Sequence, residues 1–392
     1  MRIAIDARWI FPEISGIGAH TQELLRYLAL VDRRNSYVLL FSDRKLAERT
    51  WAEAQLSTTS NFRPEIIPWS IFSPRGQWML PRHLQRLRID VFHSTNYMIP
   101  LAAFPRGKPG RLRCVVTIHD LIPMIFPHAT PNALKTRLFP IYKRLMMEVG
   151  LRADRIITVS EASRQDVLRH LQIAPSRHSS VSVIYNGVSE SFQPAKTDTI
   201  PRSPEKIILY VGRRDPYKNL VNLLDAFALA RKQCPVPLRL KLIGPADPRY
   251  PQAEEKIRQL DIGYCVDQVG YQSLKELVHA YQTASLTVLP SRYEGFGFPV
   301  VESMACGTPV VCSDIPVLRE VAGDAALYAA PDDIPAMSAA LCRAATDGGL
   351  RTELARKGLA RSALFSWKEN AIRTVQLYDQ VGSNAPMKEA SS

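Results

Sequence analysis

The chain has 392 residues, of which 46% are hydrophobic, and a formal net charge of +13. This length exceeds one ordinary hydrophobic core and predicts two globular domains. The chain lacks an uncharged apolar run of about 18 residues, and its first residues enter a strand pattern directly, so we expect a cytoplasmic protein without a signal peptide. Six cysteines without a C-x-x-C pair argue against a disulfide framework or a zinc site.

The positive charge is concentrated in the first half of the chain. Residues 1–190 carry 26 Lys and Arg residues against 15 Asp and Glu residues, whereas residues 191–392 are close to balance. Basic amphipathic stretches at 73–88 and 135–145 favour an anionic membrane surface as partner, and hence a peripheral location on the inner face of the plasma membrane. A solvated basic face without a partner is the alternative, and no nucleic-acid-binding motif is visible.

Short β-branched runs alternate with helical patterns along both halves of the chain, which predicts an α/β protein with two Rossmann-like domains and parallel sheets. The strands are expected at 2–6, 37–41, 91–92, 114–118 and 155–159, and then at 206–211, 238–243, 265–269, 286–289 and 309–312.

The domain boundaries follow from composition. Residues 1–190 form the predicted first domain and 191–365 the second, joined by a segment rich in Pro, Ser and Thr that ends near residue 204. Residues 366–380 read as an amphipathic helix, and 381–392 as a disordered tail. Because open α/β sheets bind ligands beyond the carboxyl ends of their strands, a cleft between the domains is the expected site.

The first domain offers several candidate residues after its strands. Gly16 and Gly18 lie in a predicted loop and could bring backbone amides near a phosphate or an acceptor. This G-x-G lacks the third glycine of a dinucleotide fingerprint, so NAD binding is a weak alternative. We assign His93 and Asn96 to the part of the site that would bind the second substrate, the acceptor of a transferred group. Strand capping is an equal alternative. His20 is assigned a structural role.

In the second domain, Arg213 and Lys218 follow a strand that ends at Gly212. An Arg fork and a Lys point charge can bracket a diphosphate, which predicts a donor-binding loop without a metal. No Asp-x-Asp pair indicates a metal site. Arg214 is expected to be exposed, with Asp215 pairing with it or initiating a turn.

Residues 291–311 carry the most specific pattern, in which Glu294 and Glu302 bracket a glycine-rich loop and a helix start. Pro299 suits the first helical position and Gly307 the end. The free N–H groups near Val300 and Val301 would bind a phosphate, with Phe296, Gly297 and Phe298 completing the donor-binding loop. Glu294 could accept hydrogen bonds from sugar hydroxyls and Glu302 from a ribose diol.

These motifs resemble those of retaining GT-B glycosyltransferases of family 4. The resemblance rests on residues 291–311 and, in order along the chain, on Ile5–Arg8, Ser15–Thr21, Phe92–Asn96, Val116–Pro123, Ile184–Val188 and Tyr210–Asn219. It implies that the last helix crosses back onto the first domain and that Arg213 and Lys218 bind donor phosphates. It also implies that His119 contacts the transferred sugar, through a donated hydrogen bond or its backbone carbonyl.

The expected reaction is retaining transfer of a hexose, mannose from GDP-mannose, onto a lipid-linked or polysaccharide acceptor in cell-surface glycan assembly. UDP-glucose and UDP-N-acetylglucosamine stay open as donors, and a polyprenyl-diphosphate-linked saccharide is the expected acceptor. No cofactor is expected. Glu294 is the only candidate nucleophile for a double displacement, but a front-face route is favoured. A nucleotide-sugar epimerase and a non-catalytic nucleotide-sugar-binding protein are the alternatives.

Overall fold

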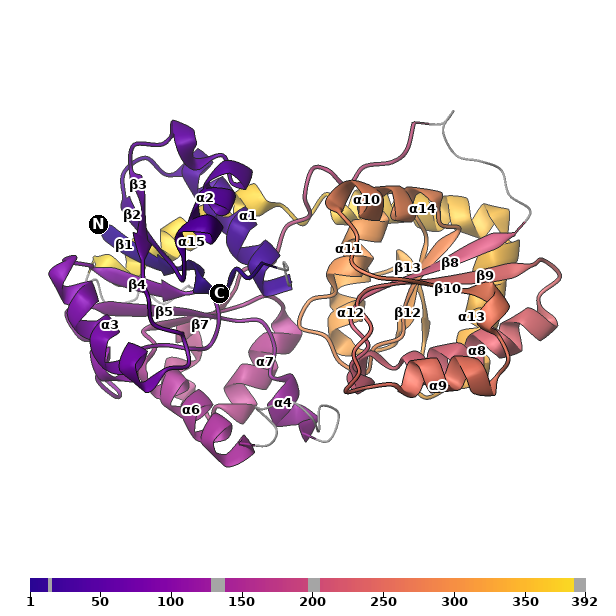
Figure 1. Cartoon of the computed structure of the whole chain (residues 1–392), viewed down its shortest axis with the longest axis horizontal. Helices are drawn as coiled ribbons and strands as arrows, with labels where there is room; N and C mark the ends of the chain where they lie inside the picture. Colours follow the sequence, from indigo (N-terminus) through magenta and orange to yellow (C-terminus); the bar gives the residue numbers. More distant parts are fainter. Residues whose placement is uncertain (13–15, 128–137, 197–204, 384–392) are drawn as a thin grey trace. The chain divides into compact units, whose positions relative to one another are not determined.

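The computed structural model describes residues 1–12, 16–127, 138–196 and 205–383 (Figure 1). The described residues divide into two compact units. Unit 1 comprises Met1–Leu121, Pro140–Gly187 and Ser366–Ser392, and unit 2 comprises Ile122–Phe139 and Val188–Phe365. Unit 2 therefore includes the segment that begins at Ile122, which the sequence analysis places in the first domain. Residues 384–392 of the predicted tail and residues 135–137 of the second basic stretch lie outside the described residues.

Unit 1 is built on a seven-stranded, fully parallel sheet. Its strand order is β3-β2-β1-β4-β5-β6-β7. The strands are β1 (Arg2–Asp6), β2 (Ser36–Phe41), β3 (Phe62–Ile66), β4 (Val91–Ser94), β5 (Arg113–Ile118), β6 (Arg155–Thr158) and β7 (Val181–Val183). The helices that belong to it are α1 (Gly16–Val31), α2 (Arg44–Glu53), α3 (Pro74–Arg86), α6 (Phe139–Arg152), α7 (Glu161–His170) and α15 (Trp367–Gly382).

Unit 2 repeats this plan with a six-stranded parallel sheet of order β10-β9-β8-β11-β12-β13. The strands are β8 (Lys206–Val211), β9 (Leu238–Ile243), β10 (Val266–Val269), β11 (Leu286–Leu289), β12 (Val310–Ser313) and β13 (Ala326–Ala329). The helices are α4 (Ile122–Ile125), α8 (Leu220–Gln233), α9 (Gln252–Gln259), α10 (Leu274–Thr283), α11 (Phe298–Ala305), α12 (Pro316–Ala322), α13 (Ile334–Thr346) and α14 (Gly348–Ser362). Within the described residues, no helix is both long and apolar enough to cross a membrane.

Both predicted Rossmann-like sheets are confirmed, and the strands that the sequence analysis missed all lie at sheet edges. Central strands are buried on both faces, as in β1, where Ile3, Ala4 and Ile5 are fully buried, and this produces continuous apolar runs. The missed strands β3, β7 and β13 are edge strands, and each of them pairs with only one other strand. β3 contains Pro64, which an edge strand tolerates because one row of its N–H groups has no partner strand.

The last helix, α15, is held to unit 1 by two buried contacts. The His93 ring lies in β4 and hydrogen-bonds Tyr378 through Nδ1 (2.6 Å) and Thr117 through Nε2 (2.9 Å). At the start of α15, a Cβ added to Gly187 would lie 2.2 Å from the backbone nitrogen of Trp367. Only a glycine therefore allows the chain to pass this helix start so closely. In Figure 1, α15 is the yellow helix among the indigo and purple elements of unit 1.

We expect Gly187→Ala to destabilise unit 1, because the added methyl group meets backbone atoms that cannot rotate away. The cost should be about 2 to 3 kcal/mol, which is typical of overpacking. That corresponds to a fall of roughly 5 to 10 °C in the melting temperature, measured by circular dichroism. The control is Gly263→Ala, whose new Cβ would approach no atom closer than 4.0 Å. Equal melting temperatures for the two variants would contradict the role of this close contact.

Candidate functional site

In unit 2, Lys218 and Glu294 meet at the carboxyl ends of two neighbouring strands. Lys218 follows β8 and Glu294 follows β11, and β8 and β11 pair side by side. The Lys218 Nζ lies 2.7 Å from Glu294 Oε1, and the Ser291 hydroxyl donates to the same oxygen at 2.7 Å. The other oxygen of Glu294 has no hydrogen-bond partner among the described residues. Glu294 is thus held in one orientation with a free acceptor.

The two loops that carry this ion pair are tied together through backbone groups. Asn219, in a left-handed conformation at φ 62°, donates from Nδ2 to the carbonyls of Pro290 (3.1 Å) and Pro331 (2.7 Å). The N–H of Arg292 donates to the carbonyl of Tyr217 at 2.9 Å. Burial alone would lower the pKa of Lys218, but the Glu294 carboxylate raises it, so the ammonium stays charged.

The arginines after β8 differ from the predicted arrangement. Asp215 pairs with Arg213 (Nε to Oδ2, 2.9 Å), not with Arg214. Arg214 is not exposed, since its side chain retains only 4% of its accessible surface and bonds Glu254 and Gln268. The Arg213 side chain is 60% exposed. Arg213 is therefore the arginine of this loop that a ligand can reach, although it already has a carboxylate partner.

The loop after β11 leads into α11 as the sequence predicted, with one difference. Gly297 has φ 94° at the helix start, and a Cβ there would lie 2.8 Å from Leu318. The Val300 N–H donates to the Gly297 carbonyl at 3.0 Å, so the prediction that this group is free is wrong. Val300 and Val301 are fully buried, backbone included, so neither residue has exposed surface for a ligand in this structure.

Aromatic packing fixes the middle of the same loop. Phe296 is buried and packs edge-on against Phe298 and Phe365, with ring centroids 5.5 and 5.4 Å apart. The buried Phe296 ring therefore holds the loop in place, and the partly exposed Phe298 is the first residue of α11. The predicted helix end is confirmed, because α11 stops at Ala305 and Gly307 has φ +74°.

Glu302, one turn into α11, has a partner that the sequence analysis missed. The Tyr281 hydroxyl, from the end of α10, donates to Glu302 Oε2 at 2.8 Å. Burial raises the pKa of Glu302 to about 7, and the Tyr281 hydrogen bond lowers it in part. Tyr281 is fully buried, and its own carbonyl accepts from Thr308 at 2.7 Å. Nothing in the sequence marks Tyr281, because it lies 21 positions before its partner.

In unit 1, His119 follows β5 and is held by the neighbouring strand. Its Nε2–H donates to the carbonyl of Thr95, which follows β4, at 3.0 Å. Burial lowers the pKa of His119, so the ring is neutral and Nδ1 is an acceptor. Nδ1 has no partner among the described residues. In this state Nδ1 can accept a hydrogen bond, whereas the ring N–H that the prediction assigns to the sugar already donates to Thr95. Its backbone carbonyl accepts from Ser163 at 3.3 Å.

His20 belongs to the same cluster, although the sequence analysis gave it a structural role. Its ring lies edge-on to His119, with centroids 4.6 Å apart, and its Nδ1 bonds the Asn186 side-chain oxygen at 2.8 Å. Burial lowers the pKa of His20 well below its usual value, with His119 adding to the effect. The sequence did offer a signal for this role of His20. His20 and its partner Asn186 both lie in stretches that carry the family resemblance, Ser15–Thr21 and Ile184–Val188.

The other residues of unit 1 that were assigned to the site make structural contacts or lie in an element that was not expected. His93 is fully buried with both ring nitrogens bonded, and burial lowers its pKa to about 3. In this structure the side chain fastens α15 to the sheet, and its assignment to the acceptor side stays a prediction. Asn96 accepts from the Tyr97 N–H at 2.9 Å, which matches the strand-capping alternative. Gly16 and Gly18 form the first turn of α1 instead of a loop, where helix N–H groups lack intrahelical partners.

Comparisons with known proteins identify the family and the fold. The model of the Glycosyltransferase Family 4 matches residues 14–192, and that of Glycosyl transferases group 1 matches residues 193–361. The O-antigen chain mannosyltransferase B of Escherichia coli is 29% identical over 410 residues, covering 96% of this chain and 99% of that protein.

Two solved structures share the fold over nearly the whole chain. Sucrose-phosphate synthase from Thermosynechococcus elongatus has a TM-score of 0.75 at 21% identity, covering 98% of this chain and 100% of that one. HepE of Anabaena, solved with UDP-glucose, has a TM-score of 0.73 at 17% identity, covering 97% of this chain and 100% of that one. By its two family matches and its two parallel-sheet domains, the chain belongs to the GT-B glycosyltransferases of family 4.

Proposed function

We propose that this glycosyltransferase moves mannose from GDP-mannose onto a lipid-linked or polysaccharide acceptor in cell-surface glycan assembly, with retention at the anomeric carbon and without a metal. The observation that carries the proposal is the Lys218–Glu294 pair in front of α11. It sets a cation for the donor phosphate beside a carboxylate with a free oxygen for sugar hydroxyls. The name of the relative from Escherichia coli supports mannose and a surface polysaccharide, whereas the HepE complex keeps UDP-glucose as the second donor.

The bonds of Glu294 favour a front-face route. A nucleophilic carboxylate must attack the anomeric carbon with a high electron density on one oxygen. The Lys218 ion pair and the Ser291 hydrogen bond stabilise the negative charge of Glu294, which weakens the carboxylate as a nucleophile and leaves its free Oε2 as an acceptor for hydroxyls. The departing phosphate, beside Lys218 and Arg213, is then the group that takes the proton of the acceptor hydroxyl. In unit 1, His119 offers Nδ1 as an acceptor for a hydroxyl.

The basic helix α3 supports a membrane-bound acceptor. Arg75, Trp78 and Arg82 follow one another at helical spacing and are all exposed, with 68% of the Trp78 surface accessible. The opposite face of α3 buries Leu80 and Leu84. An aromatic side chain among arginines on one helix face suits the interface of an anionic bilayer.

We expect the chain to transfer label from GDP-[14C]mannose into the lipid fraction of a membrane extract, and to transfer little from UDP-glucose. Glu294→Gln and Lys218→Met should each reduce this transfer about 100-fold, the size expected for a lost contact to developing charge. The control is Lys256→Met, which breaks a comparable ion pair with Asp225 (3.0 Å) elsewhere in unit 2. Free interconverted sugar, binding without turnover, or wild-type transfer by either site variant would refute the proposal.

Donor binding should depend on pH through Glu302. Only the ionised carboxylate accepts hydrogen bonds from both ribose hydroxyls, and its pKa is about 7, so nucleoside diphosphate affinity should fall as the pH drops through 7. Tyr281→Phe removes a bond that lowers this pKa, so the midpoint should move to higher pH. Calorimetric titration with GDP and UDP measures both effects.

The matched control for this prediction is Tyr328→Phe, which removes a partly buried hydroxyl bonded to the Gly323 carbonyl (2.6 Å) in the same unit. Its pH midpoint should equal that of the wild type. A midpoint that stays in place or moves down in Tyr281→Phe would show that Glu302 does not bind the ribose.

The α3 face should bind anionic vesicles. Replacing Arg75 and Arg82 by Gln, or Trp78 by Ala, should weaken flotation with phosphatidylglycerol vesicles, and salt should weaken it further only while the arginines remain. The control replaces Arg44 and Lys45 by Gln, which removes the same charge from the exposed surface of α2. Equal flotation of the α3 and α2 variants would count against this face.

A further inference from the structure

In unit 1, two consecutive residues of α1 contact both partners of the hydrogen bond between His119 and Thr95. The His20 ring lies edge-on to the His119 ring, with centroids 4.6 Å apart. The next residue is Thr21, whose hydroxyl oxygen lies 2.9 Å from that of Thr95, within hydrogen-bond distance. The carbonyl of the same Thr95 accepts from His119 Nε2 at 3.0 Å. One turn of α1 therefore holds this pair from the helix side.

The His20 ring is itself fixed in place from two further directions. Its Nδ1 lies 2.8 Å from Oδ1 of Asn186, and because an amide oxygen can only accept, Nδ1 carries the hydrogen. The Trp367 ring, at the start of α15, packs against His20 with centroids 5.5 Å apart. The second nitrogen, Nε2, is buried and no residue in the described part of the chain bonds it. The contact with His119 is thus made by the aromatic ring and involves no hydrogen bond.

His20 occupies space beside His119 that water would otherwise fill. Burial lowers the pKa of His119, whereas the Thr95 carbonyl and the Asp120 carboxylate raise it. The other titratable groups that interact with His119 are His20 and His93, and burial lowers the pKa of both rings, so they are neutral. Removal of the His20 ring would let water reach His119, which favours the protonated form. Protonated His119 has no acceptor at Nδ1.

We propose that His20 is a positioning residue for His119. Its ring holds the His119 imidazole against Thr95, so that Nε2 donates to the carbonyl and Nδ1 is left as an acceptor. His20 is only 2% exposed and therefore acts through His119 instead of touching a substrate. The inference rests on the proposed function, in which His119 offers Nδ1 to a hydroxyl.

NMR of the full chain with isotope-labelled histidine tests the positioning without any substrate. His20→Phe keeps a ring beside His119 and loses the N–H that donates to Asn186. His20→Asn keeps an amide N–H at the position of Nδ1 and loses the ring. The His119 signal is the one that His119→Gln removes. It should show the Nε2–H tautomer in the wild type and in His20→Phe. In His20→Asn it should show both tautomers, and its titration should move to higher pH.

The transfer reaction should divide the two variants in the same way. At neutral pH, His20→Asn should lower the transfer rate roughly 10- to 100-fold, the loss expected for a misplaced group, and His20→Phe should stay near the wild type. As the pH falls, His20→Asn should lose its remaining activity at a higher pH than the wild type does, because protonation of His119 takes away the Nδ1 acceptor. His20→Gln, which also lacks the ring, replaces the Asn variant if that chain does not fold.

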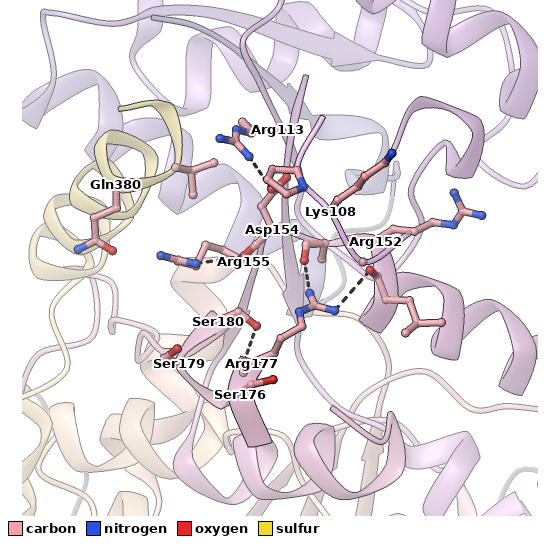
Figure 2. A pocket seen from close by; sticks show the side chains of 15 residues that line it. Lys108, Arg113, Arg152, Asp154, Arg155, Ser176, Arg177, Ser179, Ser180 and Gln380 are labelled. Atoms are coloured by element: carbon pink, nitrogen blue, oxygen red, sulfur yellow. Dashed lines mark hydrogen bonds and ion pairs between the residues drawn. The ribbon is translucent and has the colours of Figure 1, made fainter. Parts of the chain in front are cut away.

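The matched control is His178→Asn, which removes a half-buried histidine ring at the other end of the same sheet. His178 lies in the η5 turn (Pro175–Ser180), beside the pocket drawn in Figure 2, and its Nε2 is 3.1 Å from the carbonyl of Ile173. This variant should leave the His119 signal and the transfer rate unchanged.

An unchanged tautomer and titration of His119 in the variants without the ring would overturn the proposal. So would a loss of the Nε2–H tautomer in His20→Phe, because the bond to Asn186 would then be the part that matters. The expected NMR changes in a chain that transfers no mannose would support the positioning and refute the proposed function, so the two can fail separately.

Discussion

Parallel pairing of every strand in both sheets is the constraint on which the candidate site depends. In each sheet the chain enters every strand at the same end and leaves it at the opposite end. The loops that follow strands therefore gather along the carboxyl ends of the strands in each unit. Because β8 and β11 are neighbours, Lys218 and Glu294 meet across 76 positions of sequence. Because β4 and β5 are neighbours, the carbonyl of Thr95 meets the ring of His119. Neither pair could form if one of these strands were reversed.

The charged side chains that follow β8 and β11 in unit 2 are paired with one another. Lys218 is paired with Glu294 and Arg213 with Asp215, so the local formal charge is zero. A half-buried ammonium without a partner would lose its proton readily, and the carboxylate prevents this. An ammonium has three donors, so Lys218 can keep Glu294 and also bind a phosphate. Under the proposed function a diphosphate would add negative charge here, and Arg213, whose side chain is 60% exposed, is the cation of this loop that could meet it.

The sequence predicted those features that depend on neighbours along the chain. Apolar runs identified the central strands, and the glycine and proline around Glu294 identified the start of α11. Three of the four edge strands, β3, β7 and β13, were missed because half-exposed strands need no apolar run, as Pro64 in β3 illustrates. The exposure expected of Arg214 was wrong because its partner, Glu254, lies on an element distant in sequence, and the bond of His93 to Tyr378 had no local signal for the same reason. Side-chain contacts between elements that are distant in sequence leave no local sequence pattern. These contacts decide whether a polar side chain is free to bind a ligand or is used to hold the fold together.

The basic excess of the first half of the chain also acquires a physical meaning in unit 1. There, Arg75 and Arg82 are exposed on one face of α3. At physiological ionic strength the field of such charges decays within about 8 Å. It therefore acts only on what is already close, and it does not select among sugars. Selection requires groups that act on contact, such as the hydrogen-bonded groups around Glu294 in unit 2 and around His119 in unit 1.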